Sequence, residues 1–158
     1  MGHILSIIVL TIFWLTSSAQ TQDDVTGVLT TLSGQSEYIS KDSSATKLIY
    51  KGAKILPILS KCFTDTTKSK VFSKCTGRYL TRGELAIILA DQIEGMPYFT
   101  LTGLQNCTLE SCDKNPNFIE YYLEFIRFRG MTQLFQKRYN DWLESANRKK
   151  YTKQKSSD

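Results

Sequence analysis

The chain has 158 residues with 41% hydrophobic and 22% charged side chains, the composition of one globular domain rather than of a disordered chain. Its only histidine is His3, so removal of the N-terminal apolar segment excludes Ser-His-Asp and Cys-His catalysis and imidazole zinc sites. Positive charge is concentrated at the C-terminal end, where residues 127–158 carry nine Lys and Arg against three Asp and Glu.

The N-terminus has the pattern of a cleavable secretory signal. The run from Ile4 to Leu15 has no charged residue but is too short to span a bilayer, which needs about 20 residues. Small residues at Ser17 and Ala19 fit the positions that signal peptidase reads. We therefore expect residues 1–19 to be removed, with an uncleaved anchor as the alternative. The mature chain is predicted to be secreted or periplasmic, without a transmembrane segment.

Residues 20–43 are polar and predict a flexible lead-in, with one short helix near 25–32. A helical domain is expected over 44–147. Gly52 would end its first helix, and apolar residues up to Cys62 recur at three- and four-residue steps. Residues 65–80 are polar and predict a loop. Thr81 and Glu84 form a capping box that opens an almost wholly apolar helix, which we expect to be central.

A long connection over 96–115 follows that helix, and its length indicates a functional or cross-linked loop. A further helix should begin after Asn115-Pro116 and end at Gly130, and a last helix should begin near Thr132. The basic tail comprises residues 148–158. The predicted fold class is thus all-α, a small domain of αα-hairpins.

Four cysteines in an exported chain predict two disulfides, which would pin the two loops. The expected pairs are Cys62–Cys75 and Cys107–Cys112, because both close locally. Bridges Cys62–Cys112 or Cys75–Cys107 are the alternative pairing, and a zinc site built from all four thiolates is the alternative chemistry. No metal site and no cofactor are predicted.

Residues 48–65 resemble the second half of a HEAT-type helical repeat, in which a short helix ends at Gly and the next carries an Ile-Leu-Pro-x-Leu face. A shift of 31 residues places Gly52 on Gly83 as a second, degenerate repeat. The resemblance implies stacked helices and binding rather than catalysis. The whole chain also resembles small exported proteins of Bacteroidetes-type bacteria that carry no assigned activity.

Three sets of residues are candidates for function. Glu84 and Asp91 lie seven residues apart on one helix and would be the catalytic pair if the protein were an enzyme. Tyr98 and Phe99, in the long connection, form a possible binding loop. The basic tail offers contacts to anionic surfaces, although no nucleic-acid motif accompanies it.

These observations favour an exported, non-enzymatic binding protein of the cell envelope or secretome, with a protein or an envelope surface as its partner. One alternative is a carboxylate-based hydrolase acting on cell-wall glycan. Another is an inhibitor or immunity-type protein directed against an exported enzyme.

Overall fold

The computed structural model describes residues 22–104 and 115–149. The predicted signal peptide therefore lies outside the described residues. Residues 22–31 and 146–149 are helical. The other elements, in chain order, are β1 (Ser33–Gln35), η1 (Ser36–Lys41), α2 (Ser43–Tyr50), η2 (Gly52–Ile55), α3 (Leu56–Lys61), β2 (Lys68–Ser73), β3 (Arg78–Thr81), α4 (Arg82–Glu94), α5 (Tyr98–Thr102), α6 (Glu120–Arg127), η3 (Phe128–Gly130) and α7 (Met131–Glu144). Among the described residues, no helix is both long and apolar enough to cross a membrane.

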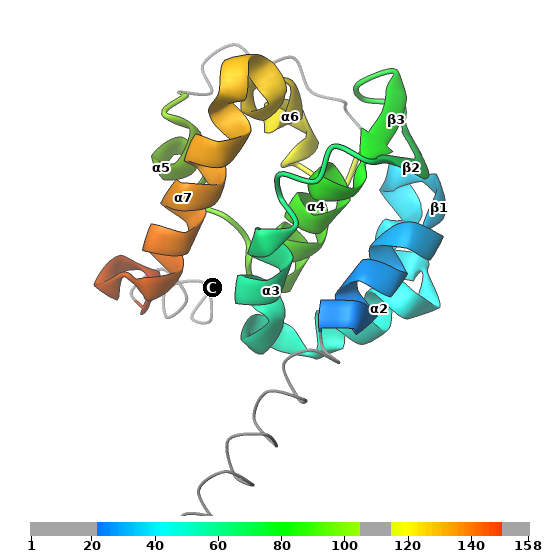
Figure 1. Ribbon diagram of the computed structural model, residues 1–158, viewed down its shortest axis with the longest axis horizontal. Coiled ribbons are helices and arrows are strands. Elements are labelled where there is room, and N and C mark those ends of the chain that lie inside the picture. The colour runs from blue at the N-terminus through cyan, green and yellow to red at the C-terminus, as the bar shows by residue number, and fades with distance from the viewer. Residues whose placement is uncertain (1–21, 105–114, 150–158) are drawn as a thin grey trace, which may run out of the picture.

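A three-stranded mixed sheet makes the prediction of an all-α domain wrong. Its strand order is β1-β2-β3, with β1 parallel to β2 and β2 antiparallel to β3. In Figure 1 the sheet and α2 lie on one side of α4, and α5 and α7 lie on the other. The protein is therefore a helical domain with a small sheet on one flank.

The predicted loop 65–80 forms the hairpin of β2 and β3. Along β2, Val71 and Ser73 are buried while Lys68 and Lys70 are exposed, which is the period-two pattern of a half-buried strand. Gly77 has a φ of 68° between the two strands, a left-handed value that glycine adopts without steric strain. The alternation is hard to recognise in the sequence because one of the inward residues is a serine.

Helix α4 is the central element, as its apolar sequence predicts. Every residue from Gly83 to Ala90 is buried, and the helix packs against α2 and α3. A Cβ atom on Gly83 would lie 2.3 Å from the carbonyl oxygen of Phe63, so only glycine fits there. Gly52, which the internal repeat aligns with Gly83, instead has a φ of 66° after the end of α2. The two glycines thus have different structural roles.

The expected lead-in is part of the packed domain. Residues 22–41 contribute the helix 22–31, strand β1 and helix η1. Val25, Leu29 and Ile39 are buried in the core. Val25 and Leu29 are four residues apart and so share one helix face, which explains why a polar segment can still pack.

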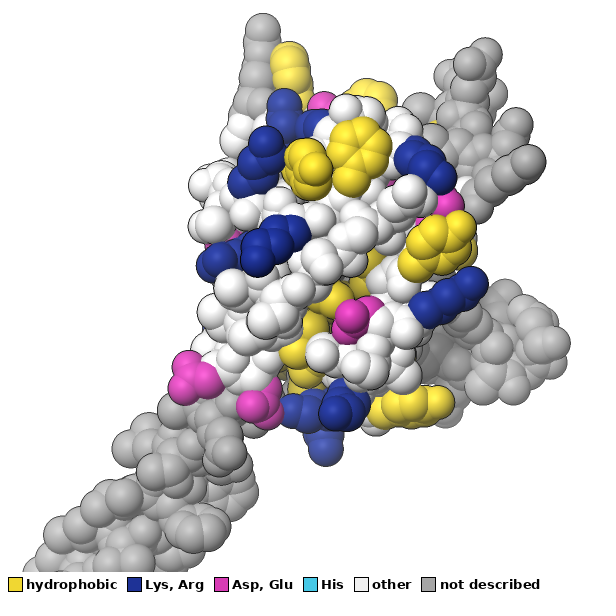
Figure 2. Space-filling view, turned by 90° about the vertical axis from the view of Figure 1, so that its right-hand side faces the viewer, with side chains coloured by type: hydrophobic (Ala, Val, Ile, Leu, Met, Phe, Trp, Pro, Cys, Tyr) yellow, Lys and Arg dark blue, Asp and Glu magenta, His cyan; other side chains and the backbone are white. Residues whose placement is uncertain are grey.

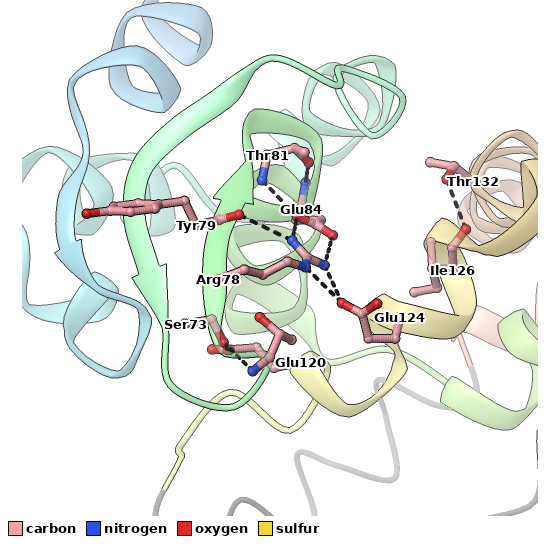
Figure 3. Close-up of polar contacts among 10 residues, drawn as sticks. Ser73, Arg78, Tyr79, Thr81, Glu84, Glu120, Glu124, Ile126 and Thr132 are labelled. Carbon is pink, nitrogen blue, oxygen red and sulfur yellow. Dashed lines mark hydrogen bonds and ion pairs between the residues drawn. The ribbon is translucent and has the colours of Figure 1, made fainter.

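A buried polar cluster joins the sheet to α6. Glu120 is 1% exposed and accepts hydrogen bonds from Ser36 Oγ (3.1 Å), Asn117 Nδ2 (3.0 Å) and Ser73 Oγ. Figure 3 shows Ser73 and Glu120 facing each other across the gap between β2 and α6. The three donors come from segments far apart in the sequence, so the cluster fixes the position of α6 against the sheet.

The predicted local disulfides are not found among the described residues, where no two cysteines are joined. Cys62 is a half-buried free thiol, so the pair Cys62–Cys75 is wrong. Cys75 itself is disulfide-bonded, but not to Cys62. The six residues of β2 span about 20 Å when extended, which carries Cys75 away from the end of α3. Cys107 and Cys112 lie outside the described residues.

The boundary between the two C-terminal helices lies at Gly130 as predicted, but α6 begins at Glu120 rather than directly after Pro116. Gly130 has a φ of 76° between η3 and α7, which allows the sharp change of direction there. Arg148, the first residue of the predicted tail, forms two hydrogen bonds with Glu94 at 2.6 and 2.7 Å and so ties the chain to α4. Residues 150–158 of the tail lie outside the described residues.

Candidate functional site

The first predicted catalytic carboxylate, Glu84, is held by the fold itself. Its oxygens accept two hydrogen bonds from Arg78, at 2.8 and 2.6 Å, and one from the backbone N–H of Thr81 at 2.7 Å. The last bond completes the predicted capping box at the start of α4. Figure 3 shows the Arg78 guanidinium lying between Glu84 and Glu124. These hydrogen bonds raise the pKa of Arg78 above its ordinary value, Glu84 contributing most.

A partly polar pocket of about 280 Å³ lies beside Glu84. Asp65 and Arg127 also line it, together with apolar side chains such as Phe63 and Leu123. The Glu84 side chain is only 7% exposed, and both of its oxygens are occupied by Arg78 and Thr81. The hydrogen bonds of the carboxylate are therefore already made within the fold beside this pocket.

The second predicted carboxylate, Asp91, lies near the other end of α4. It accepts a hydrogen bond from the backbone N–H of Met96 at 2.8 Å and from the Tyr98 hydroxyl at 2.9 Å. Seven helical residues separate Asp91 from Glu84, a rise of about 10 Å along the axis. The two carboxylates do not converge on one site. Asp91 instead holds the turn that leads into α5.

Tyr98 and Phe99, the predicted binding loop, are the first two residues of α5. The Tyr98 ring stacks on Tyr122 of α6 with ring centroids 5.1 Å apart and an angle of 12°. It also contacts Phe118 at 5.2 Å. The Phe99 side chain is 57% exposed. The structure therefore separates this pair into one residue that anchors α5 and one that faces solvent.

An apolar pocket of about 150 Å³ lies between α5, α6, η3 and α7. All of its lining residues but one are apolar: Leu101, Thr102, Leu104, Phe125, Ile126, Phe128, Met131 and Phe135. A hydrogen bond from Arg138 Nη1 to the Leu101 carbonyl, at 3.0 Å, ties the α5 wall to the α7 wall. Two large aromatic side chains lie at the rim of this pocket. Phe125 is 45% exposed and Phe128 is 62% exposed.

The pocket was not predicted from the sequence, although one signal pointed to it. In the helix expected after Pro116, one apolar face at helical spacing comprises Phe118, Ile119, Tyr122, Leu123 and Ile126. Phe128 lies off that face, and a large apolar residue outside a core face indicates a second contact surface. The α5 wall had no such signal, because its helix is short and lies within the long connection.

The described residues contain no cluster of three or more side chains suited to binding a metal ion. No protein-family model matches the chain, and comparisons with curated proteins and with solved structures find no match. The chemistry of the site therefore has to be inferred from its own geometry.

Proposed function

We propose that this chain is an exported, non-enzymatic binding protein that holds a protein partner through the apolar pocket of α5, α6, η3 and α7. The predicted signal peptide over residues 1–19 supports export. The hydrogen bonds of Glu84 and Asp91 support a binding function rather than glycan hydrolysis, because both carboxylates already accept hydrogen bonds from other residues of the domain.

The pocket and its exposed rim carry this proposal. A cavity of about 150 Å³ matches one aromatic ring or one branched aliphatic side chain. Hot spots of protein interfaces have this form, with an anchor side chain in a desolvated pocket and other contacts around it. Phe125 and Phe128 would then cover the anchor. Basic residues follow the pocket along the chain, which favours a partner with acidic residues around its anchor.

The test is retention of a partner by the immobilised mature protein from the secreted and envelope fractions of its source. Phe128→Ser removes an exposed ring at the rim of the pocket. Tyr50→Ser is the matched control, because Tyr50 is 86% exposed and lies on α2, on the other side of the molecule in Figure 1. We expect one protein to be retained by the unmodified chain and by Tyr50→Ser, but not by Phe128→Ser. Equal retention by both variants would contradict the proposal.

The captured partner also distinguishes the inhibitor alternative. If the partner is an exported enzyme whose activity falls when the pocket is occupied, the protein acts as an inhibitor. Hydrolysis of cell-wall glycan by the purified chain, lost in Glu84→Gln while that variant is still folded, would instead support the enzyme.

A further inference from the structure

Lysines and aromatic rings share the outward face of β2 and β3. Lys68, Lys70 and Phe72 alternate along β2 with the buried Val71, so they lie on the side away from the core. Tyr79 is paired with Phe72 across the two strands, and their ring centroids are 5.4 Å apart. Figure 2 views this side of the molecule and shows Lys and Arg side chains around exposed rings, with few acidic groups among them. We call Lys68, Lys70, Phe72 and Tyr79 the lysine–aromatic face.

The rings hold ammonium groups in place at this surface. Lys68 Nζ lies over the Tyr79 ring at 5.0 Å from its centroid. Lys41 Nζ lies over the Tyr38 ring at the same distance on η1, which packs against β2. A cation over an aromatic face is attracted by the ring quadrupole while it stays exposed. The rings thus restrict the lysine side chains without neutralising them.

The positive charge of β1, η1 and the β2–β3 hairpin, the elements around this face, is not balanced locally. Within 33–41 and 68–81 there are five Lys and Arg and one Glu. Arg78 belongs to the cluster with Glu84 and Glu124, which leaves four lysines against Glu37. Glu37 pairs with Lys74 at 3.4 Å. Among the described residues no carboxylate lies within ion-pair distance of the remaining three, Lys41, Lys68 and Lys70.

We propose that the lysine–aromatic face binds a linear acidic polysaccharide that carries sulfate or uronate groups. Lys68 and Lys70 lie two residues apart on β2, where its pairing with β3 is irregular, and both are exposed. A linear polymer with repeating anionic groups can contact both charges and the rings beside them. Single-stranded nucleic acid is less suited, because its bases stack on open aromatic faces. Here Lys68 covers one face of Tyr79, and Phe72 packs against the same ring.

The test measures binding of the mature chain to heparin, a sulfated polysaccharide, over a range of salt concentrations. The double variant Lys68→Gln, Lys70→Gln is compared with Lys61→Gln, Lys137→Gln. Both remove two exposed lysines and keep the basic tail, but the control pair lies on α3 and α7. We expect the first variant to raise the Kd about tenfold and to lower the salt slope by about two, one for each lysine that is replaced. The control should change the Kd by less than about twofold.

Three results would overturn the proposal. An equal loss in both double variants would mean that heparin responds to net charge or to the tail rather than to this face. Tighter binding of oligo(dT) than of heparin, with the same dependence on Lys68 and Lys70, would assign the face to nucleic acid. Failure of the unmodified chain to bind heparin at low salt would also reject it. None of these results bears on the apolar pocket, which lies on other elements.

Discussion

Replacing Glu84 with Gln distinguishes a structural carboxylate from a catalytic one. Glutamine keeps the shape of the side chain, but it replaces one acceptor oxygen with an amide that donates. At the Oε1 position that amide faces Arg78 Nη2, and at the Oε2 position it faces both Arg78 Nη1 and the Thr81 N–H; all are donors that Glu84 binds at 2.6 to 2.8 Å. At least one of these hydrogen bonds is therefore replaced by a repulsive contact in either orientation.

The magnitude follows from burial. Breaking one side of a buried ion pair is destabilising by about 3–5 kcal/mol. The Arg78 side chain is 22% exposed and keeps Glu124 as a partner, so the lower part of that range applies. We expect a loss of about 3 kcal/mol in the free energy of unfolding, measured by urea denaturation. With a slope of about 1–3 kcal/mol per molar urea, the midpoint should fall by about 1 M or more.

Glu124→Gln is the matched control, because it changes the other carboxylate on the same arginine. The Glu124 side chain is 53% exposed, and exposed ion pairs contribute at most about 1 kcal/mol. A loss below about 1 kcal/mol for Glu84→Gln, or a gain in stability, would refute the structural role. Carboxylates kept for catalysis are often held at the expense of stability, and their neutralisation then stabilises the fold.

Three further predictions concern contacts in the core. Glu120→Gln should destabilise by about 1–3 kcal/mol in urea, because either orientation of the amide leaves buried donors unpaired; an unchanged midpoint would contradict this. Gly83→Ala should lower the thermal midpoint sharply, because its Cβ would lie 2.3 Å from the carbonyl oxygen of Phe63. Gly27→Ala in the helix 22–31 is the control: its Cβ would meet no atom within 4 Å, and the change should stabilise the fold by up to about 1 kcal/mol. Burial raises the pKa of the Cys62 thiol, so less thiolate is present at a given pH in the folded chain. Alkylation of Cys62 should therefore begin at higher pH in the folded than in the unfolded chain. Identical pH profiles of alkylation would contradict the burial of Cys62.

Local sequence signals predicted most of the helices and the central element. The capping box of Thr81 and Glu84 placed the start of α4 correctly, because both partners lie within four residues. The uniform apolar character of that helix also predicted its burial. Gly130 also marked the boundary before α7 correctly, because the left-handed backbone at this position favours glycine.

The sheet and the proposed binding surfaces depend on contacts between distant residues, which the sequence does not display. Ser73 faces inward because it donates to Glu120, 47 residues further along the chain, so strand β2 lacks a clean apolar alternation. The lysine–aromatic face also cannot be recognised from the sequence, because the net charge of residues 1–126 is close to zero. The acidic side chains that balance the count, such as Glu84, lie elsewhere in the fold.

The apolar pocket is the feature on which the proposed function depends, and NMR of side-chain methyl groups tests it most directly. Benzene is the probe, because a cavity of about 150 Å³ holds one such ring. We predict saturable shifts of the methyl signals of Leu101, Leu104 and Met131, with the buried core methyls of Ile88 and Leu89 unchanged. No shift at the pocket methyls, or shifts of equal size in the core of α4, would contradict an open site for an apolar side chain.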